Sequence, residues 1–133
     1  MTKRSKTPQV QIDPILARIP SPWAQEVSCR SGWWPLLSEL DREVSSLLPD
    51  YVIHQVKEKF GTLRFYWAIP EGAEGRLPGH DLESLRTKIN ALVAAAEKRS
   101  AEICEICGKP GRLTRIGGWW QTSCASHRPI PIL

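Results

Sequence analysis

Long hydrophobic runs and export signals are both missing from this sequence. No apolar stretch approaches the roughly 18 residues that a membrane-spanning helix needs. The start of the chain is basic and polar, whereas a secretory signal would continue into an apolar stretch of about 7 to 15 residues. These absences predict a cytoplasmic protein that has no membrane partner.

The sequence also has few residues that could form an active site. It contains no Ser/His/Asp grouping, no phosphate-binding glycine loop and no His-Glu-x-x-His helix. His54 lies between Val52 and Val56 on the predicted apolar face of a strand, which favours a core histidine over a general base. His80 lies in a glycine-rich loop, where a structural role is also favoured. We therefore predict that the protein is not an enzyme, with catalysis through His54 or His80 as the open alternative.

Charge of either sign is present only in ordinary amounts. The chain carries 18 Lys and Arg residues against 14 Asp and Glu residues, which gives a net charge of +4. A surplus of this size permits nucleic acid as a partner but does not require it. With 133 residues and 41% hydrophobic residues, the chain has the size and composition of one soluble globular domain.

Prolines and the spacing of apolar residues predict four helical segments. Asp13-Pro14 and Ser21-Pro22 each place a capping side chain before a proline, which favours two short helical turns. Over residues 35–48, apolar residues recur every three or four positions, and this spacing predicts an amphipathic helix. A second long helix is predicted over residues 81–103, directly before the first cysteine of the C-terminal third.

The period of the apolar residues changes from 3.6 to 2 in the middle of the chain. Residues 51–56 and 63–69 alternate in this way, and the polar sequence between them contains Gly61, so we predict a β-hairpin. The predicted apolar face carries Val52, His54, Val56, Leu63, Phe65 and Trp67. Together these elements predict an α+β fold in which helices pack on a small antiparallel hairpin or sheet.

Four residues of the C-terminal third have the spacing of a metal site. Cys104 and Cys107 form a Cys-x2-Cys pair, and Cys124 and His127 form a Cys-x2-His pair sixteen residues further on. A two-residue gap lets both side chains of a tight turn reach one tetrahedral ion, and zinc prefers this mixture of thiolate and imidazole. Without an export signal, a metal site is favoured over two disulfides, and buried free thiols are the alternative. We predict one Zn²⁺ ion bound by these four side chains.

The predicted zinc ion has a structural role. Four protein ligands close its coordination shell and leave no position for an activated water. Residues 112–123 between the ligand pairs predict two short strands around Gly117-Gly118, because adjacent glycines accept the positive φ angles of a type I′ turn. In that register Arg115 faces Trp120. The C-terminal third is therefore predicted to be a zinc-ribbon-like hairpin.

These patterns divide the chain into three regions. Residues 1–12 are polar, basic and without periodicity, and we predict a flexible arm there. Residues 13–103 form the predicted α+β core. Residues 104–133 form the predicted zinc-binding hairpin module, which we expect to pack on the core.

Charged and aromatic residues at two turns are candidates for binding a partner. The turn of the predicted core hairpin concentrates both kinds of side chain, and loops often carry recognition, although a solvated turn is the alternative. Consecutive strand positions point to opposite faces, so we expect one of Trp119 and Trp120 to pack on the core. The other would contact Arg115 or anchor a partner. The predicted partner-binding residues are Lys57, Lys59, Phe60, Arg64, Arg115, Trp119 and Trp120.

Three sequence blocks resemble a known family. The first is Gly-Trp-Trp-Pro-Leu-Leu at residues 32–37, and the second is Gln-Val-Lys-Glu-Lys-Phe-Gly-Thr-Leu-Arg-Phe-Tyr at residues 55–66. The third combines Cys-x2-Cys-Gly-x-Pro-Gly with Gly-Gly-Trp-Trp-x-Thr-x-Cys-x2-His. In their order and their residues, these blocks resemble the motifs of a family of small zinc-binding proteins of bacterial chromosomes, prophages and phages. The resemblance covers roughly residues 29–127 and implies a compact zinc-bearing domain in a bacterial cytoplasm, or in the bacterial host cell of a phage.

Two functions follow from these expectations. The first is a non-enzymatic, zinc-stabilised interaction protein, encoded by a phage or prophage, whose partner is a host or other bacterial protein. A component of antiviral defence such as a CRISPR effector is one such partner, and binding would inhibit it. The alternative is a nucleic-acid-binding zinc-ribbon module that uses the basic arm, the hairpin and Trp120.

Overall fold

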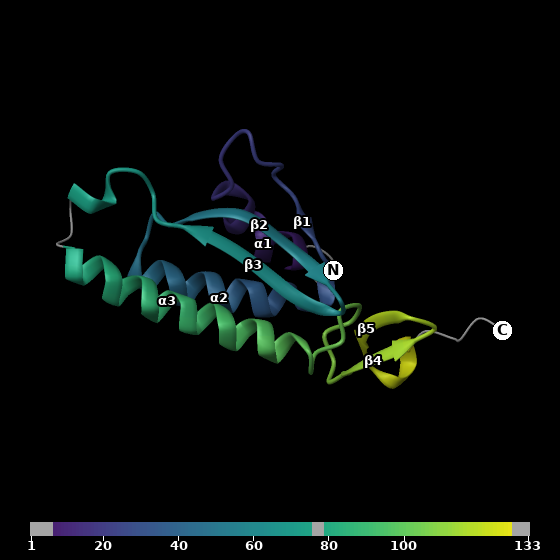
Figure 1. The fold of residues 1–133 in the computed structure, drawn as a ribbon. Coiled ribbons are helices and arrows are strands. Elements are labelled where there is room, and N and C mark those ends of the chain that lie inside the picture. The colour runs from purple at the N-terminus through teal and green to yellow at the C-terminus, as the bar shows by residue number, and fades with distance from the viewer. Residues whose placement is uncertain (1–6, 76–78, 129–133) are drawn as a thin grey trace.

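The computed structural model describes residues 7–75 and 79–128, and it confirms an α+β fold (Figure 1). The helices are α1 (Thr7–Ala17), α2 (Trp34–Leu47) and α3 (Gly79–Ser100). The strands are β1 (Val27–Ser28), β2 (Val52–Lys59), β3 (Thr62–Ala68), β4 (Arg112–Ile116) and β5 (Trp119–Ser123), with 3-10 turns η2 (Ser31–Trp33), η3 (Ala73–Gly75) and η4 (Ala125–His127). In the described ranges, no helix combines the length and the apolarity of a membrane span.

The elements form two β-structures joined by a long helix. Strands β1, β2 and β3 make one sheet in that order, and β4 and β5 make a separate hairpin. Helices α2 and α3 run side by side below the β2–β3 hairpin in the view of Figure 1, and the β4–β5 hairpin lies beyond the end of α3. This arrangement places the C-terminal hairpin beside the turn that connects β2 and β3.

Helix α2 confirms the amphipathic helix that its sequence predicts. Pro35 lies in its first turn, where the missing N–H would have no helical partner. The helix ends before Pro49, and the N–H of Leu48 donates to the oxygen of Val44 at 2.9 Å. Its buried residues are Leu36, Leu37, Leu40, Asp41 and Val44.

The β2–β3 hairpin is confirmed, but its predicted apolar face is partly wrong. Leu63 and Phe65 are buried as expected. The register shifts between Ile53 and Gln55, so that one residue of β2 has no partner in β3. Because such a bulge reverses the alternation, Ile53 becomes fully buried on the same side as Val56.

Val52 and His54 are therefore only half-buried, which corrects the prediction that both belong to the apolar face. His54 stacks instead on Trp23, with ring centroids 4.4 Å apart and an interplanar angle of 7°. The predicted role of His54 as a core histidine was wrong, because alternation along the sequence cannot reveal the bulge that turns this residue outward.

The N-terminal region differs from its prediction in two ways. Helix α1 begins at Thr7, so residues 7–12 are helical rather than part of an arm, and Pro14 lies inside the helix. Residues 1–6 lie outside the described ranges. The predicted helical turn after Ser21-Pro22 was also wrong, because the N–H of Trp23 donates to the oxygen of Pro20 in a single tight turn that no helix follows. The chain turns there and then forms β1, where Val27 pairs in parallel with Val56 of β2.

Helix α3 also has different ends from those predicted. It starts at Gly79 rather than at Asp81, and it stops at Ser100 rather than at Ile103. Ile103 instead forms an isolated β-bridge with Pro110, which turns the chain into the loop of the first cysteine pair. His80 is the second residue of α3, and its side chain lies outside the described part of the structure.

The buried apolar cluster lies between the helices and the sheet. Its buried members run in sequence from Ile15 to Ala96, and Ile103 packs against it as a half-buried residue. Among the described residues, none of β4 or β5 belongs to this cluster. The C-terminal hairpin must therefore be held by interactions other than a shared hydrophobic core.

Candidate metal centre and adjoining aromatic pocket

Cys104, Cys107, Cys124 and His127 lie together as the sequence predicts. Their four ligand atoms all lie within 4.8 Å of one another. The Sγ atoms of Cys107 and Cys124 are 3.7 Å apart, and Nδ1 of His127 is 3.3 Å from Sγ of Cys124 and 3.7 Å from Sγ of Cys104. This grouping is consistent with a structural metal site.

The first ligand pair is held by a tight turn. The N–H of Gly108 donates to the oxygen of Cys104 at 2.9 Å, and the N–H of Cys104 donates to the oxygen of Lys109 at 2.8 Å. Gly108 has a φ of 84°, in the region that glycine adopts without strain. The turn directs Sγ of Cys104 and Sγ of Cys107 toward the same point, as a Cys-x2-Cys pair requires.

The second ligand pair lies at the end of β5. Cys124 directly precedes the 3-10 turn η4, and the N–H of His127 donates to the oxygen of Cys124 at 3.1 Å. One turn of this kind brings Nδ1 of His127 back to the sulfur of Cys124. Strand β5 therefore places Cys124 and His127 beside the first pair, Cys104 and Cys107.

Local hydrogen bonds favour the thiolate form of the buried ligand. Burial alone would raise the pKa of Cys104, but the backbone N–H groups of Cys107, Cys124 and Ile106 outweigh it and lower that pKa to about 6. The pKa of Cys124 is also lowered, because its hydrogen bonds to His127, to Cys107 and to the backbone of Ser126 together outweigh the effect of burial. A thiolate is the form that binds a metal ion.

Cys29 is a different kind of thiol. It lies outside the cluster of four, and burial raises its pKa to about 12, with smaller contributions from the carboxylates of Glu105 and Glu58. Burial therefore keeps Cys29 in its protonated thiol form at neutral pH, and a buried thiol of this kind is unreactive.

Gly32 connects the metal turn to the core. Its N–H donates to the oxygen of Glu105 at 2.7 Å, and a Cβ on this residue would lie 2.2 Å from the oxygen of Cys104. The neighbouring Trp33 is fully buried, and its Nε1 donates to the oxygen of Ile103 at 2.8 Å. The turn that carries Cys104 and Cys107 therefore packs against the Gly-Trp-Trp block at residues 32–34.

A second connection joins β5 to the turn of the β2–β3 hairpin. The hydroxyl of buried Thr122 donates to the oxygen of Gly61 at 2.7 Å. Gly61 has a φ of 85°, and a Cβ there would lie 2.5 Å from the side chain of Leu113. The N–H of Glu105 donates to the oxygen of Thr122 at 3.0 Å, so the metal turn, β5 and the β2–β3 turn form one continuous network.

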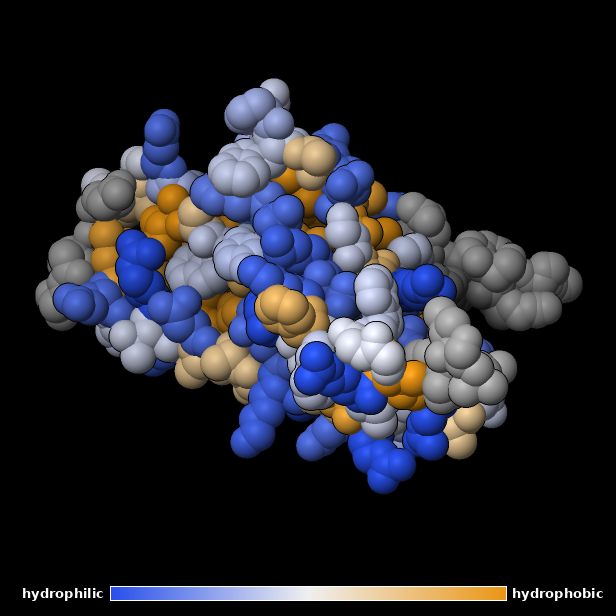
Figure 2. Space-filling view, turned by 45° about the vertical axis from the view of Figure 1, so that its right-hand side comes forward, coloured by the Kyte–Doolittle hydropathy of each residue, from blue (hydrophilic) through white to orange (hydrophobic). Residues whose placement is uncertain are grey.

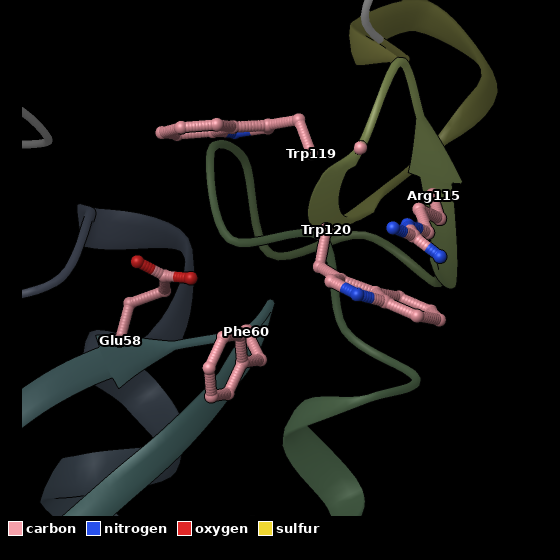
Figure 3. A pocket seen from close by; sticks show the side chains of 6 residues that line it. Glu58, Phe60, Arg115, Trp119 and Trp120 are labelled. Atoms are coloured by element: carbon pink, nitrogen blue, oxygen red, sulfur yellow. The ribbon is translucent and has the colours of Figure 1, made fainter.

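An open pocket lies where these two hairpins meet (Figure 3). Its volume is about 370 Å³, and its lining residues are Glu58, Phe60, Arg115, Gly118, Trp119 and Trp120. Phe60 is 64% exposed, Trp119 68% and Trp120 38%. On the face shown in Figure 2, apolar side chains appear as separate patches among charged and polar ones. The pocket is thus a concentration of aromatic surface from two distant parts of the chain.

The structure brings four of the seven predicted partner-binding residues into this pocket: Phe60, Arg115, Trp119 and Trp120. The other three are Lys57, Lys59 and Arg64, which lie on the adjoining strands β2 and β3. The predicted register of the C-terminal hairpin is confirmed, since Arg115 pairs with Trp120. The guanidinium of Arg115 lies 5.7 Å from the centroid of the Trp120 ring. The prediction that one tryptophan packs on the core was wrong, because both rings are exposed at the junction.

Several residues of the junction were not identified from the sequence. Glu58 is not among the predicted partner-binding residues, yet its carboxylate lines the pocket, and its Oε2 accepts the N–H of Gly61 at 2.7 Å. Gly32 and Glu105 join the core to the metal turn across more than 70 residues of sequence. The doublet of glycine and tryptophan was the available signal for Gly32, because a glycine beside a large buried ring often marks a close backbone approach.

No family model, curated protein or solved structure matches the chain in the comparisons made.

Proposed function

We propose that this protein is a non-enzymatic interaction protein that is stabilised by one structural zinc ion and binds a partner protein through the aromatic pocket. The observation that carries this proposal is the clustering of Phe60, Trp119 and Trp120 around one open pocket. Exposed aromatic rings in a concave site are typical of binding hot spots, in which tryptophan is enriched.

Three of the six distances among the ligand atoms fit the geometry of a zinc site, and all six lie within 4.8 Å. With Zn–S bonds of about 2.3 Å and a Zn–N bond of about 2.0 Å, a tetrahedral site has S···S edges of about 3.8 Å and S···N edges of about 3.5 Å. The corresponding separations here are 3.7 Å between Cys107 and Cys124, and 3.7 and 3.3 Å from the two sulfurs to His127. Three thiolates and one imidazole are also a ligand set that zinc prefers.

A structural role fits the position of this ion better than a catalytic one. Cys104, Cys107, Cys124 and His127 would fill all four coordination positions, which leaves none for a reacting water. The same four ligands tie the ends of the β4–β5 hairpin to the turn that rests on Gly32. When bound, the ion would stabilise the half of the pocket that carries Trp119 and Trp120.

Affinity capture tests the proposed binding surface. We expect the immobilised protein to enrich a bacterial host protein from a nuclease-treated lysate, and Trp119→Ala to weaken that capture about 30-fold or more, as loss of a hot-spot tryptophan costs about 2 kcal/mol. Quantitative mass spectrometry of the eluates measures the change.

Trp23→Ala is the matched control for this experiment. Trp23 is also exposed, at 46%, but it stacks on His54 and does not line the pocket. If the Trp119→Ala and Trp23→Ala variants capture the partner equally well, the pocket is not the binding surface. If the protein captures partners from an untreated lysate but none from a nuclease-treated lysate, the nucleic-acid-binding alternative is favoured.

The class of partner stays a prediction. The family resemblance favours a host protein of antiviral defence, with inhibition as the result of binding. The identity of the captured protein in the Trp119-dependent fraction tests this expectation directly.

A further inference from the structure

Three cations gather on the solvent-facing side of the β2–β3 hairpin. Val56 and Phe65 pair across the two strands and are buried, so the residues next to them along each strand point to the opposite face. On that face Lys57 pairs directly with Arg64, and Lys59 lies two residues further along β2. We call Lys57, Lys59 and Arg64 the basic face.

The basic face opposes the pairing of its own strands. Like charges directly opposite each other destabilise an antiparallel pair, whereas opposite charges stabilise it. Among the described residues, no ion pair joins a carboxylate to the basic face. Arg64 donates to the hydroxyl of Thr62 and to the oxygen of Leu63, which are both neutral, and Nζ of Lys59 lies 5.7 Å from the centroid of the Phe60 ring. An anionic ligand would offset a repulsion that these contacts do not.

Carboxylates near the basic face are fewer than its cations. Glu58 lies between Lys57 and Lys59 in sequence, but its side chain is on the other face of the hairpin and lines the aromatic pocket (Figure 3). Glu26 precedes β1, and its Oε2 accepts the hydroxyl of Ser28, which pairs with Lys57. Glu26 thus sets one negative charge near three positive ones, and the face keeps a positive surplus.

An exposed aromatic ring lies on the same face as these cations. Tyr66 is 43% exposed and follows Arg64 by two residues on β3, so both side chains point to the same side. Opposite Tyr66 lies Gln55, an exposed residue whose amide can donate to and accept from the edge of a base. Modules that bind single strands on a β-sheet use this combination, with bases stacked on rings and phosphates bound by cations.

A single-stranded nucleic acid fits this surface better than other polyanions do. Each of its bases has a flat face that can stack on Tyr66, and each base brings a phosphate toward the neighbouring Arg64. A segment of Asp and Glu residues would satisfy the cations but has no ring to stack on Tyr66. A duplex has its bases stacked on one another, so that their flat faces cannot reach the ring.

We infer that the basic face and Tyr66 bind a segment of single-stranded nucleic acid, with phosphates on the cations and a base on the ring. This inference goes beyond the proposed function, because the surface lies on the other face of the hairpin from Glu58 and takes a different class of ligand. It predicts binding that depends on salt and on the basic face, and that does not require Trp119.

Fluorescence anisotropy of labelled octathymidylate and octauridylate tests the inference with the full chain loaded with zinc. We expect at least one of the two to bind at roughly 50 mM salt. The logarithm of its association constant should fall with the logarithm of the salt concentration with a slope of about −2, since each of three phosphate contacts to a single strand contributes about −0.7. Binding of octaglutamate and of a blunt duplex should be at least tenfold weaker.

Lys57→Glu separates the loss of binding from the loss of folding. This variant places a carboxylate opposite Arg64, so the melting temperature should not fall, while the affinity for the oligonucleotide should fall at least tenfold. Tyr66→Ala should weaken binding about fivefold or more through the loss of stacking. Lys88→Glu is the matched control, because Lys88 is an exposed residue of α3 beside Leu47 and undergoes the same change of charge. Its affinity should stay within about twofold of the original.

Several results would overturn the inference. They are no binding of either oligonucleotide with the protein at millimolar concentration, equal binding of octaglutamate or the duplex, and an equal loss of affinity in Lys88→Glu and Lys57→Glu. Trp119→Ala should leave oligonucleotide binding unchanged, so the proposed function and this inference are tested by different residues. If oligonucleotide binding is lost in Trp119→Ala but kept in Lys57→Glu, the nucleic acid occupies the aromatic pocket and the inference is wrong.

Discussion

Removal of the metal is expected to unfold residues 104–127 while the α+β core stays folded. A structural zinc site contributes about 10 to 16 kcal/mol of apparent binding free energy, which is comparable with the whole stability of a domain of this size. An isolated two-stranded hairpin is marginal in water, and among the described residues none of β4 or β5 belongs to the buried apolar cluster. Amide hydrogen exchange with and without a chelator measures the effect residue by residue.

Thiol titration provides the control for metal removal. With zinc bound, we expect none of the four cysteines to react rapidly with a thiol reagent at pH 8. After chelation three should react rapidly, while Cys29 should stay slow because its pKa is about 12 in the folded core. Protected amides throughout residues 104–127 after complete removal of the metal would contradict this account. Rapid reaction of Cys29 would show that the core unfolds too.

Gly32→Ala is expected to destabilise the protein by about 3 kcal/mol or more. Its new Cβ would lie 2.2 Å from the oxygen of Cys104 and 2.4 Å from that of Glu105, so two backbone segments would have to separate. Overpacking of a well-packed site costs about 1 to 3 kcal/mol, and a backbone carbonyl yields less easily than a flexible side chain. Because the displaced carbonyls belong to the metal turn, affinity for zinc should fall as well. Chemical denaturation with zinc in excess gives the change in stability.

Gly75→Ala is the matched control for the loss of glycine itself. A Cβ on Gly75 meets no atom within 4 Å, and we expect its free energy of unfolding to stay within about 0.5 kcal/mol of the original value. If the Gly32→Ala and Gly75→Ala proteins have the same free energy of unfolding, the turn of Cys104 and Cys107 does not pack against the core as described.

The cluster of four candidate metal ligands could be predicted from the sequence because its geometry is local. Cys104 and Cys107 lie in one turn, and Cys124 and His127 in another, so the spacing within each pair reports the geometry directly. The turn of the β4–β5 hairpin was predictable for the same reason, since Gly117 and Gly118 both have positive φ angles of 59° and 82°. Signals of this kind depend on a few consecutive residues and need no knowledge of the rest of the fold.

Features that depend on distant contacts could not be predicted in the same way. The bulge that turns His54 outward changes which residues of β2 are buried, but alternation in the sequence assumes a regular strand. Strand β1 has only two residues, which is too short for a periodic signal, and it exists because it pairs with β2. The pocket combines Phe60 with Trp119 and Trp120, and their proximity follows from the contact of Gly61 with Thr122.

The candidate metal centre and the pocket are physically connected. One side of the pocket belongs to the core, through Glu58 and Phe60, and the other belongs to the hairpin whose ends carry the ligands. Binding of a partner through Trp119 should therefore require the metal, even though no pocket residue is a ligand. The zinc ion would act on function by fixing the position of two aromatic rings.

Metal analysis of the purified protein tests the central claim most directly. We predict one zinc ion per chain by inductively coupled plasma mass spectrometry when cells are grown with zinc, iron and other transition metals available, and less than about a tenth of that in the double variant Cys107→Ser/Cys124→Ser. A folded protein that is purified without stoichiometric zinc, or a double variant that retains it, would contradict the account.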